Sequence, residues 1–214
     1  LHGILIKGGD ILEAAHKLRF IVFDKTGTIT KGKPEVTEIV PAAGATEKDV
    51  LRVAASLEKS SEHPLAEAIV QKAKSLPLQK VSHFQAVIGR GVQGKIGAKE
   101  YYLGNLKLMK EKKVPVTALL SKLELLEEEG KTVMVLATGK KSLGLIAVAD
   151  EIKEDSPAAV SILKNMGITT YMITGDNKRT AQAIARKVGI ENGIERTDIE
   201  DALERARTAM AALV

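Results

Sequence analysis

Two short runs rich in β-branched and aromatic residues stand out along the chain, the first of them continuously apolar, and each leads directly into a polar turn that carries one acid. Phe20–Phe23 is followed by Asp24, and Ile168–Ile173 is followed by the turn Thr174–Asp176. Runs of this kind are typical of strands buried on both faces of a parallel sheet. Taken alone, an aspartate such as Asp24 more often simply opens a turn. Because chemistry gathers at the carboxyl ends of parallel strands, the two turns, together with Asp150, are predicted to meet at one site.

Helical and strand patterns alternate along the rest of the chain. Apolar residues at helical spacing predict helices over residues 47–57, 61–73, 118–129, 156–166 and 178–188. Residues 81–103 are rich in glycine and predict antiparallel hairpins, and two further strands are expected at 132–137 and 143–148.

This order predicts an α/β fold that is interrupted once. Residues 1–32 and 149–214 are expected to form one unit with a parallel sheet. Residues 33–148 are expected to form an α+β insertion with an antiparallel sheet. The segment Lys31–Pro34 predicts a hinge between the two, because proline fixes one dihedral angle and glycine frees another.

Composition narrows the classes of function. The chain is 44% hydrophobic and 28% charged, as in ordinary soluble globular proteins, and it has no cysteine, which excludes a disulfide framework and thiolate chemistry. A net charge of +5 with only three Phe, three Tyr and no Trp argues against nucleic-acid binding. No apolar run reaches the ~18 residues of a membrane helix, and no signal peptide is visible, so we expect no direct membrane insertion by this segment.

The loop after the first apolar run carries a recognisable motif. Asp24–Thr28, which reads Asp-Lys-Thr-Gly-Thr, resembles the phosphorylation signature of P-type ATPases, whose phosphorylation unit has a haloacid-dehalogenase-like fold. Ser61–Leu65 resembles the nucleotide-unit motif of the heavy-metal-transporting, copper-type branch. Further matches to the family lie at Gly3–Asp10, Gly89–Gly91, Gly104–Asn105, Asp150–Lys153 and Thr174–Asp176. The resemblance covers residues 1 to 190.

The resemblance implies a catalytic set around an aspartyl phosphate. Asp24 would accept the γ-phosphate of ATP as an acyl phosphate. Asp24 and the Thr26 carbonyl would hold Mg²⁺, and the catalytic set would comprise Asp24, Lys25, Thr26, Thr174, Gly175 and Asp176. Related phosphatases carry a water-activating acid where this chain has Thr26. The acyl phosphate is therefore expected to persist, as an ion pump requires.

The resemblance also implies a nucleotide site in the insertion, formed by Glu58, His63, Gly89, Gly91 and Asn105. Glu58 would read the adenine edge of ATP or ADP, and His63 would orient the base or the phosphates. His63 alone is equally a helix cap, and Gly89 and Gly91 are equally turn glycines. The spacing of the whole set favours the nucleotide.

The C-terminal residues depart from the family pattern. Residues 191–214 contain neither the lysine-bearing segment nor the Gly-Asp-Gly-x-Asn-Asp loop of the family, and instead offer a capping box, Thr197–Glu200, and an amphipathic pattern. Whether this chain turns over ATP as an enzyme is therefore open.

Three functions remain. The favoured one is the catalytic segment, on the cytoplasmic side of the membrane, of a heavy-metal pump, with copper as the expected ion and the pump's membrane and actuator domains as partners. A nucleotide-binding module without turnover is the alternative. A free phosphatase is disfavoured by Thr26 and by the insertion.

Overall fold

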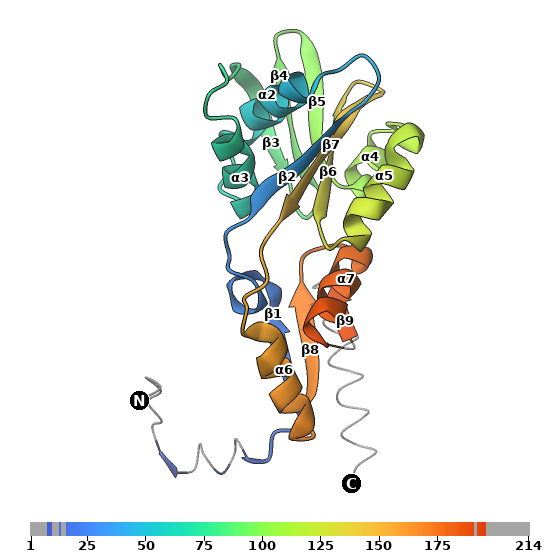
Figure 1. Cartoon of the computed structure of the whole chain (residues 1–214). Coiled ribbons are helices and arrows are strands. Elements are labelled where there is room, and N and C mark those ends of the chain that lie inside the picture. The colour runs from blue at the N-terminus through green and yellow to red at the C-terminus, as the bar shows by residue number, and fades with distance from the viewer. Residues whose placement is uncertain (1–7, 10–12, 14–15, 191, 196–214) are drawn as a thin grey trace.

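The computed structural model describes residues 8–9, 13, 16–190 and 192–195, and in this part the chain builds two separate sheets (Figure 1). The smaller sheet is parallel and has the order β1-β8-β9, with β1 Phe20–Asp24, β8 Thr169–Thr174 and β9 Asn192–Glu195. The larger sheet is antiparallel and has the order β2-β7-β6-β5-β4-β3. Its strands are β2 Glu35–Pro41, β3 Val81–Val87, β4 Gly91–Ile96, β5 Lys99–Gly104, β6 Thr132–Thr138 and β7 Lys141–Ala149. The larger sheet thus lies within the sequence that separates β1 from β8.

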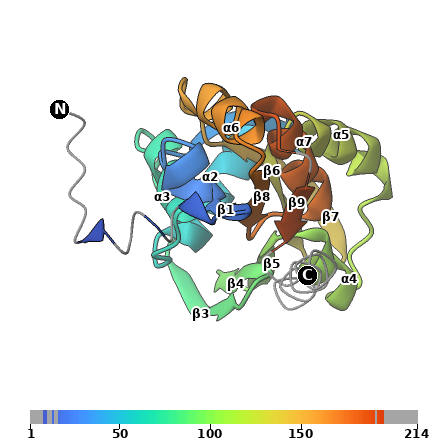
Figure 2. The same cartoon turned by 90° about the horizontal axis from the view of Figure 1, so that it is seen from below.

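The parallel sheet brings the two acid-bearing turns together. β1 and β8 pair along their whole lengths, which sets Asp24 beside Ile173. Helices α6 (Ser156–Asn165) and α7 (Lys178–Val188) lie against one face of this sheet (Figure 2). The buried core between them comprises Ile29, Val160, Met172, Ala181, Ile184, Ala185, Val188 and Ile190. Asp24 and Thr174, which end the paired strands, therefore reach the same edge of the sheet.

Among the described residues, strand β1 is covered on one face, which corrects the expectation of burial on both. The Val22 side chain is 58% exposed, whereas Phe23 packs against the core beneath α6 and α7. Side chains alternate along a strand, so Val22 and Asp24 share the face opposite Phe23. Within the described sheet β1 is also an edge strand. An apolar run alone does not reveal which faces are covered.

The antiparallel sheet is the middle layer of the inserted unit. Helices α2 (Glu47–Glu58) and α3 (Pro64–Lys72) pack on one face, and α4 (Leu106–Glu111) and α5 (Thr117–Glu128) pack on the other. Along β6 the buried side chains divide between the two cores, with Met134 and Leu136 in the first and Val133, Val135 and Ala137 in the second. This strand reads as continuously apolar because both of its faces are covered.

Asp150 ties together the two chain segments that connect the units. Its Oδ2 accepts hydrogen bonds from the Thr30 hydroxyl at 2.5 Å and the Gly32 N–H at 3.1 Å, and its Oδ1 accepts one from the Lys33 N–H at 3.0 Å. The Thr30 hydroxyl also lies 3.0 Å from the carbonyl oxygen of Lys25. Both oxygens of Asp150 are thus engaged at the hinge. Asp150 contacts the loop that follows Asp24 through Thr30, and its place at the site itself stays a prediction.

No helix within the described ranges combines the length and the apolar character needed to cross a bilayer.

Candidate active site

The exposed carboxylate of Asp24 begins a fixed loop. Asp24 ends β1, and its side chain makes no capping hydrogen bond to the turn Lys25–Ile29 that follows, in which Thr26 and Gly27 have non-helical dihedral angles. Gly27 sits in this turn at φ 77°, a conformation that glycine adopts without strain. The turn is held at two points, because the Thr30 N–H donates to the Lys25 carbonyl at 3.0 Å and Lys153 Nζ donates to the Gly27 carbonyl at 2.7 Å. The loop is therefore tied at both points, and it presents the exposed Asp24 carboxylate, which makes no capping hydrogen bond to the turn.

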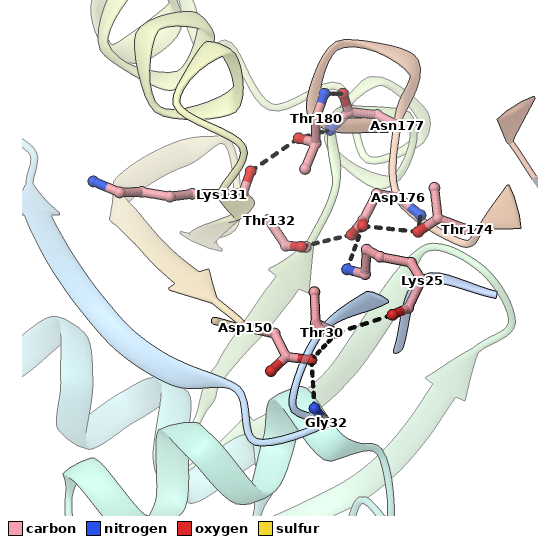
Figure 3. A network of polar contacts seen from close by, with 10 residues as sticks. All are labelled: Lys25, Thr30, Gly32, Lys131, Thr132, Asp150, Thr174, Asp176, Asn177 and Thr180. Carbon is pink, nitrogen blue, oxygen red and sulfur yellow. Dashed lines mark hydrogen bonds and ion pairs between the residues drawn. The ribbon is translucent and has the colours of Figure 1, made fainter. Parts of the chain in front are cut away.

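Asp176 is the centre of a buried polar network next to this loop (Figure 3). Lys25 Nζ lies 2.5 Å from Asp176 Oδ2, and the two side chains are only 10% and 7% exposed. The Thr174 hydroxyl also donates to Oδ2, at 2.8 Å, and accepts from the Asp176 N–H at 3.1 Å. Thr132 approaches from the opposite side of the carboxylate and donates to Oδ1 at 2.6 Å. The network joins both strand-end turns and one residue of the inserted unit.

The network keeps Asp176 ionised. Burial by itself would raise the pKa of Asp176, but the charge of Lys25 and the hydrogen bonds from Lys25, Thr132 and Thr174 outweigh burial and hold the pKa below its ordinary value. Thr132 was not among the predicted site residues. A threonine that opens a strand carries no sequence signal of this contact, because the contact depends on how the two units sit together.

Gly175 has no packing reason to be glycine among the described residues. A Cβ at this position would meet no atom within 4 Å. Lys25, Thr174 and Asp176 are thus in direct contact, while Asp24, Thr26 and Gly175 lie on the exposed side of the same two turns. Their roles in catalysis remain predictions.

The inserted unit has a cavity of about 260 Å³ at the junction of α2 and α3. Its lining includes Glu58 and His63, two of the five predicted nucleotide residues. Gly89, Gly91 and Asn105 form a second group, in which Asn105 Nδ2 donates to the Gly89 carbonyl at 3.0 Å. Of the predicted set, Glu58 and His63 thus line the cavity, whereas Gly89, Gly91 and Asn105 lie where β4 begins and β5 ends.

Glu58 is a buried acid, and one of its two carboxyl oxygens lacks a hydrogen-bond partner among the described residues. The residue is 5% exposed, and its Oε2 has no hydrogen-bond partner in the described structure. Burial raises the pKa of Glu58, and a hydrogen bond with Ser61 opposes this only in part. A buried carboxyl that faces a cavity with a free oxygen is typical of a ligand-binding group.

We expect Glu58→Gln to stabilise the ligand-free chain at neutral pH by about 1 kcal/mol, because an amide avoids burial of a charge. A carboxyl whose folded-state pKa is raised contributes its full stability below the unfolded pKa, and this contribution is lost as pH rises through the folded value. The gain should therefore grow from pH 4.5 to pH 8. Urea unfolding across this range measures it.

Glu62→Gln is the matched control, because Glu62 lines the same cavity but is exposed. Parallel pH profiles for wild type and Glu58→Gln would show that Glu58 is not a strained ionisable group.

His63 and Asn105 each cap the N-terminus of a helix in the ligand-free chain. His63 Nδ1 accepts from the Leu65 N–H at 3.2 Å and so caps α3, and Asn105 Oδ1 accepts from the Leu108 N–H at 3.1 Å and caps α4. In a neutral ring with Nδ1 as acceptor, the proton sits on Nε2, which is then a donor for a ligand. His63 is therefore a helix cap, and this role leaves its Nε2 available to a nucleotide.

Gly91 has a packing reason to be glycine. Its φ is 142°, and a Cβ there would lie 2.1 Å from the carbonyl oxygen of Leu103 and 2.5 Å from Gly104 Cα on the paired strand β5. A bulky residue at this position would damage the sheet. A loss of nucleotide binding on changing Gly91 would therefore not distinguish a binding role from a structural one.

The sequence matches known proteins over most of its length. The family model described as haloacid dehalogenase-like hydrolase matches residues 18–209. The chain is 48% identical over 192 residues to a copper-exporting P-type ATPase of Bacillus subtilis (strain 168), and the alignment covers 89% of this chain and 24% of that protein. The chain thus spans about a quarter of the length of the curated relatives it matches.

Solved structures agree with these matches. A zinc-transporting PIB-type ATPase in the E2.Pi state superposes with a TM-score of 0.65 at 34% identity, covering 96% of this chain and 34% of that one. The catalytic domain of the CPx-ATPase CopB-B superposes with a TM-score of 0.68, over 96% of this chain and 73% of that one, and at 23% identity it supports the fold alone. The predicted fold class is confirmed, and so is the resemblance to heavy-metal P-type ATPases.

Proposed function

The chain belongs to the haloacid dehalogenase-like hydrolase family and is similar to heavy-metal-transporting P-type ATPases, and from this premise we propose that it binds ATP and accepts the γ-phosphate on Asp24 as part of such a pump. The observation that carries the proposal is the exposed Asp24 carboxylate at the end of β1, with the buried Lys25–Asp176 pair beside it. In this scheme the pump's membrane and actuator domains are the partners of the chain, which works on the cytoplasmic side.

The proposed reaction is a phosphoryl transfer to a carboxylate. An oxygen of Asp24 attacks the γ-phosphorus, the bond from that phosphorus to the β–γ bridging oxygen breaks, and the bonding electrons leave with ADP. Donors around Asp24 must offset the repulsion between the carboxylate and the triphosphate. The Lys25 ammonium, the N–H groups of the Lys25–Ile29 turn and the Thr174 hydroxyl are the candidates. Thr26 cannot activate water as a base, so the acyl phosphate should be long-lived.

Asp24 and Thr26 suit Mg²⁺ chemically. A carboxylate and a backbone carbonyl are hard oxygen donors, and Mg²⁺ is usually bound by one or two carboxylates together with substrate phosphates. Among the described residues no group of three or more His, Cys, Asp or Glu side chains could hold a metal ion. This fits an ion that arrives with the nucleotide. When bound, Mg²⁺ supplies positive charge to the triphosphate.

The nucleotide would be held by residues 33–148, the inserted unit, and phosphorylated by residues 1–32 and 149–214. The cavity beside Glu58 and His63 supports the first assignment. Copper is the proposed ion, because the chain is 48% and 45% identical to two relatives that are named copper-exporting P-type ATPases. A nucleotide-binding module without turnover remains the alternative, and it is favoured by the missing lysine segment and Gly-Asp-Gly-x-Asn-Asp loop in residues 191–214.

We expect the chain to bind ATP or ADP without Mg²⁺, because the proposed contacts are to the adenosine end. His63→Gln should weaken this binding about tenfold, the effect of losing roughly 1.4 kcal/mol of orienting interaction. Isothermal titration calorimetry on both proteins measures it. His83→Gln, outside the cavity, is the control. Unchanged affinity in His63→Gln would contradict the placement of the nucleotide.

A further inference from the structure

Thr132 connects the inserted unit to the phosphorylation loop. We propose that Thr132 is a positioning residue: its hydroxyl fixes the Asp176 carboxylate, and through Asp176 it fixes the ammonium group of Lys25. Lys25 is then placed beside Asp24 at the same time as the inserted unit docks, because both depend on the Thr132–Asp176 bond. The coupling bears on catalysis only if the proposed phosphorylation of Asp24 is correct, but the contact itself does not depend on it.

The first argument is the geometry of the Asp176 carboxylate. Oδ2 is occupied by Lys25 and Thr174, and Oδ1 is occupied by Thr132 alone among the described residues. The Thr132 bond, at 2.6 Å, is short and charge-assisted. Without it the carboxylate is held only through Oδ2, by Lys25 and Thr174, so rotation about its Cβ–Cγ bond is less restrained and the direction of the acceptor that Lys25 faces is less sharply fixed. Thr132 thus sets the position of Oδ2 by holding Oδ1.

The second argument is where Thr132 comes from. It opens β6 of the inserted unit, whereas Lys25, Thr174 and Asp176 belong to the two turns of the parallel sheet. Figure 3 shows the Thr132 and Lys131 backbone on one side of Asp176 and the Thr174 turn on the other. The inserted unit therefore reaches the candidate active site directly, in addition to its two covalent connections.

The third argument is that separate contacts lock this segment in place. Thr180 Oγ1 donates to the carbonyl of Lys131, next to Thr132, at 2.9 Å. The buried Glu127 carboxylate accepts from Asn177 at 2.8 Å and from Arg179 at 2.6 Å. These bonds hold the start of α7 against the end of α5. The spacing between Thr132 and Asp176 is thus set by rigid elements on both sides.

The consequence is a link between the two steps of the proposed reaction. The unit that would carry ATP also orders the cation that would meet its phosphate. An inserted unit that swings away breaks the Thr132–Asp176 bond and leaves Lys25 less restrained. Lys25 would then be fully placed only when the inserted unit is docked.

The reactivity of Lys25 tests the proposal in the intact chain. The chain is treated briefly with the N-hydroxysuccinimide ester of acetic acid, and acetylation of each lysine is followed by peptide mass spectrometry. Lys153 is the internal reference, because its Nζ bonds the Gly27 carbonyl on the same loop and has no contact with Thr132. We expect Thr132→Val to raise the Lys25-to-Lys153 ratio roughly fivefold, the factor that corresponds to one ordinary hydrogen bond.

Thr132→Ser separates the hydroxyl from the shape of the side chain. Valine is isosteric with threonine and keeps the strand preference, so the fold should persist. Serine restores the donor, and its ratio should return to the wild-type value. An unchanged ratio in Thr132→Val would overturn the proposal, and so would an equal rise at both lysines, since that reports general loosening. ATP titration of the same variants is a separate readout: absence of binding in wild type would refute the proposed function and leave the Lys25 result valid.

Discussion

Lys25→Met is expected to lower the free energy of unfolding by about 3–5 kcal/mol at neutral pH, the range for removing one partner of a buried ion pair. Lys25 and Asp176 are both almost fully buried and lie 2.5 Å apart. Without Lys25, the donors that the described residues offer to the Asp176 carboxylate are the hydroxyl groups of Thr132 and Thr174. Urea-induced unfolding measures the difference.

The loss of stability in Lys25→Met should depend on pH. The folded-state pKa of Asp176 is lowered, so the stability it contributes is present above the unfolded value of ~3.9 and is lost as pH falls through the folded value. Removing Lys25 raises the folded-state pKa. The deficit of Lys25→Met should therefore be largest at pH 7 and shrink toward pH 4, as Asp176 of the variant takes up a proton while Asp176 of the wild type stays ionised.

Lys153→Met is the matched control for Lys25→Met. Lys153 makes an exposed hydrogen bond to Gly27 on the same loop, so its loss should cost less than about 1 kcal/mol. A Lys25→Met protein within about 0.5 kcal/mol of wild type at pH 7 would show that the buried pair does not stabilise the site.

Steady-state hydrolysis of ATP by this chain is expected to be at least ~10²–10³-fold below the rates of typical enzymes, which are on the order of 1–10³ s⁻¹. Residues 191–214 contain neither the lysine-bearing segment nor the Gly-Asp-Gly-x-Asn-Asp loop that the family resemblance leads one to expect. Each absent group removes charge stabilisation from the transferring phosphate, and the two losses need not be additive.

Phosphate release at saturating ATP and Mg²⁺ measures this rate, and Asp24→Asn gives the background. A rate within the range of typical enzymes that disappears in Asp24→Asn would contradict the prediction. It would mean that other residues of the chain supply the absent groups.

The elements near the site were predictable because their signals are local. Two apolar runs that end at acids specify parallel strands whose carboxyl ends meet, and the register of Asp24 beside Ile173 confirms the pairing. The cap residues and glycines that bound α3, α6 and α7 are also local signals, so the boundaries of these helices came close to those observed.

Two elements of the inserted unit were missed for reasons of length and pattern. Helix α4 (Leu106–Glu111) has only six residues, too few to show a helical period. Strand β2 (Glu35–Pro41) is an edge strand that follows a proline, and it bears charged residues and a final proline. Both elements owe their structure to the sheet against which they pack.

The features that the sequence did not predict are contacts between distant segments of the chain. Nothing near Thr132 in the sequence signals that it meets an acid 44 residues away. Nor did the sequence signal that both oxygens of Asp150 would accept hydrogen bonds from the hinge segment. The incomplete hydrogen bonding of Glu58 is likewise visible only in the folded chain. Sequence motifs predicted which residues carry chemistry, and the packing of the two units decided which of them touch.

The most direct test of the proposed function is the fate of the γ-phosphate. The chain is incubated with Mg²⁺ and ATP labelled at the γ-phosphorus, quenched in acid, and analysed for protein-bound label and for its peptide position. The account predicts a slowly formed label on Asp24 that survives acid, is released by hydroxylamine as an acyl phosphate is, and is absent from Asp24→Asn. Label retained in Asp24→Asn, or no label in a wild-type chain shown to bind ATP, would contradict the claim that Asp24 accepts the phosphate.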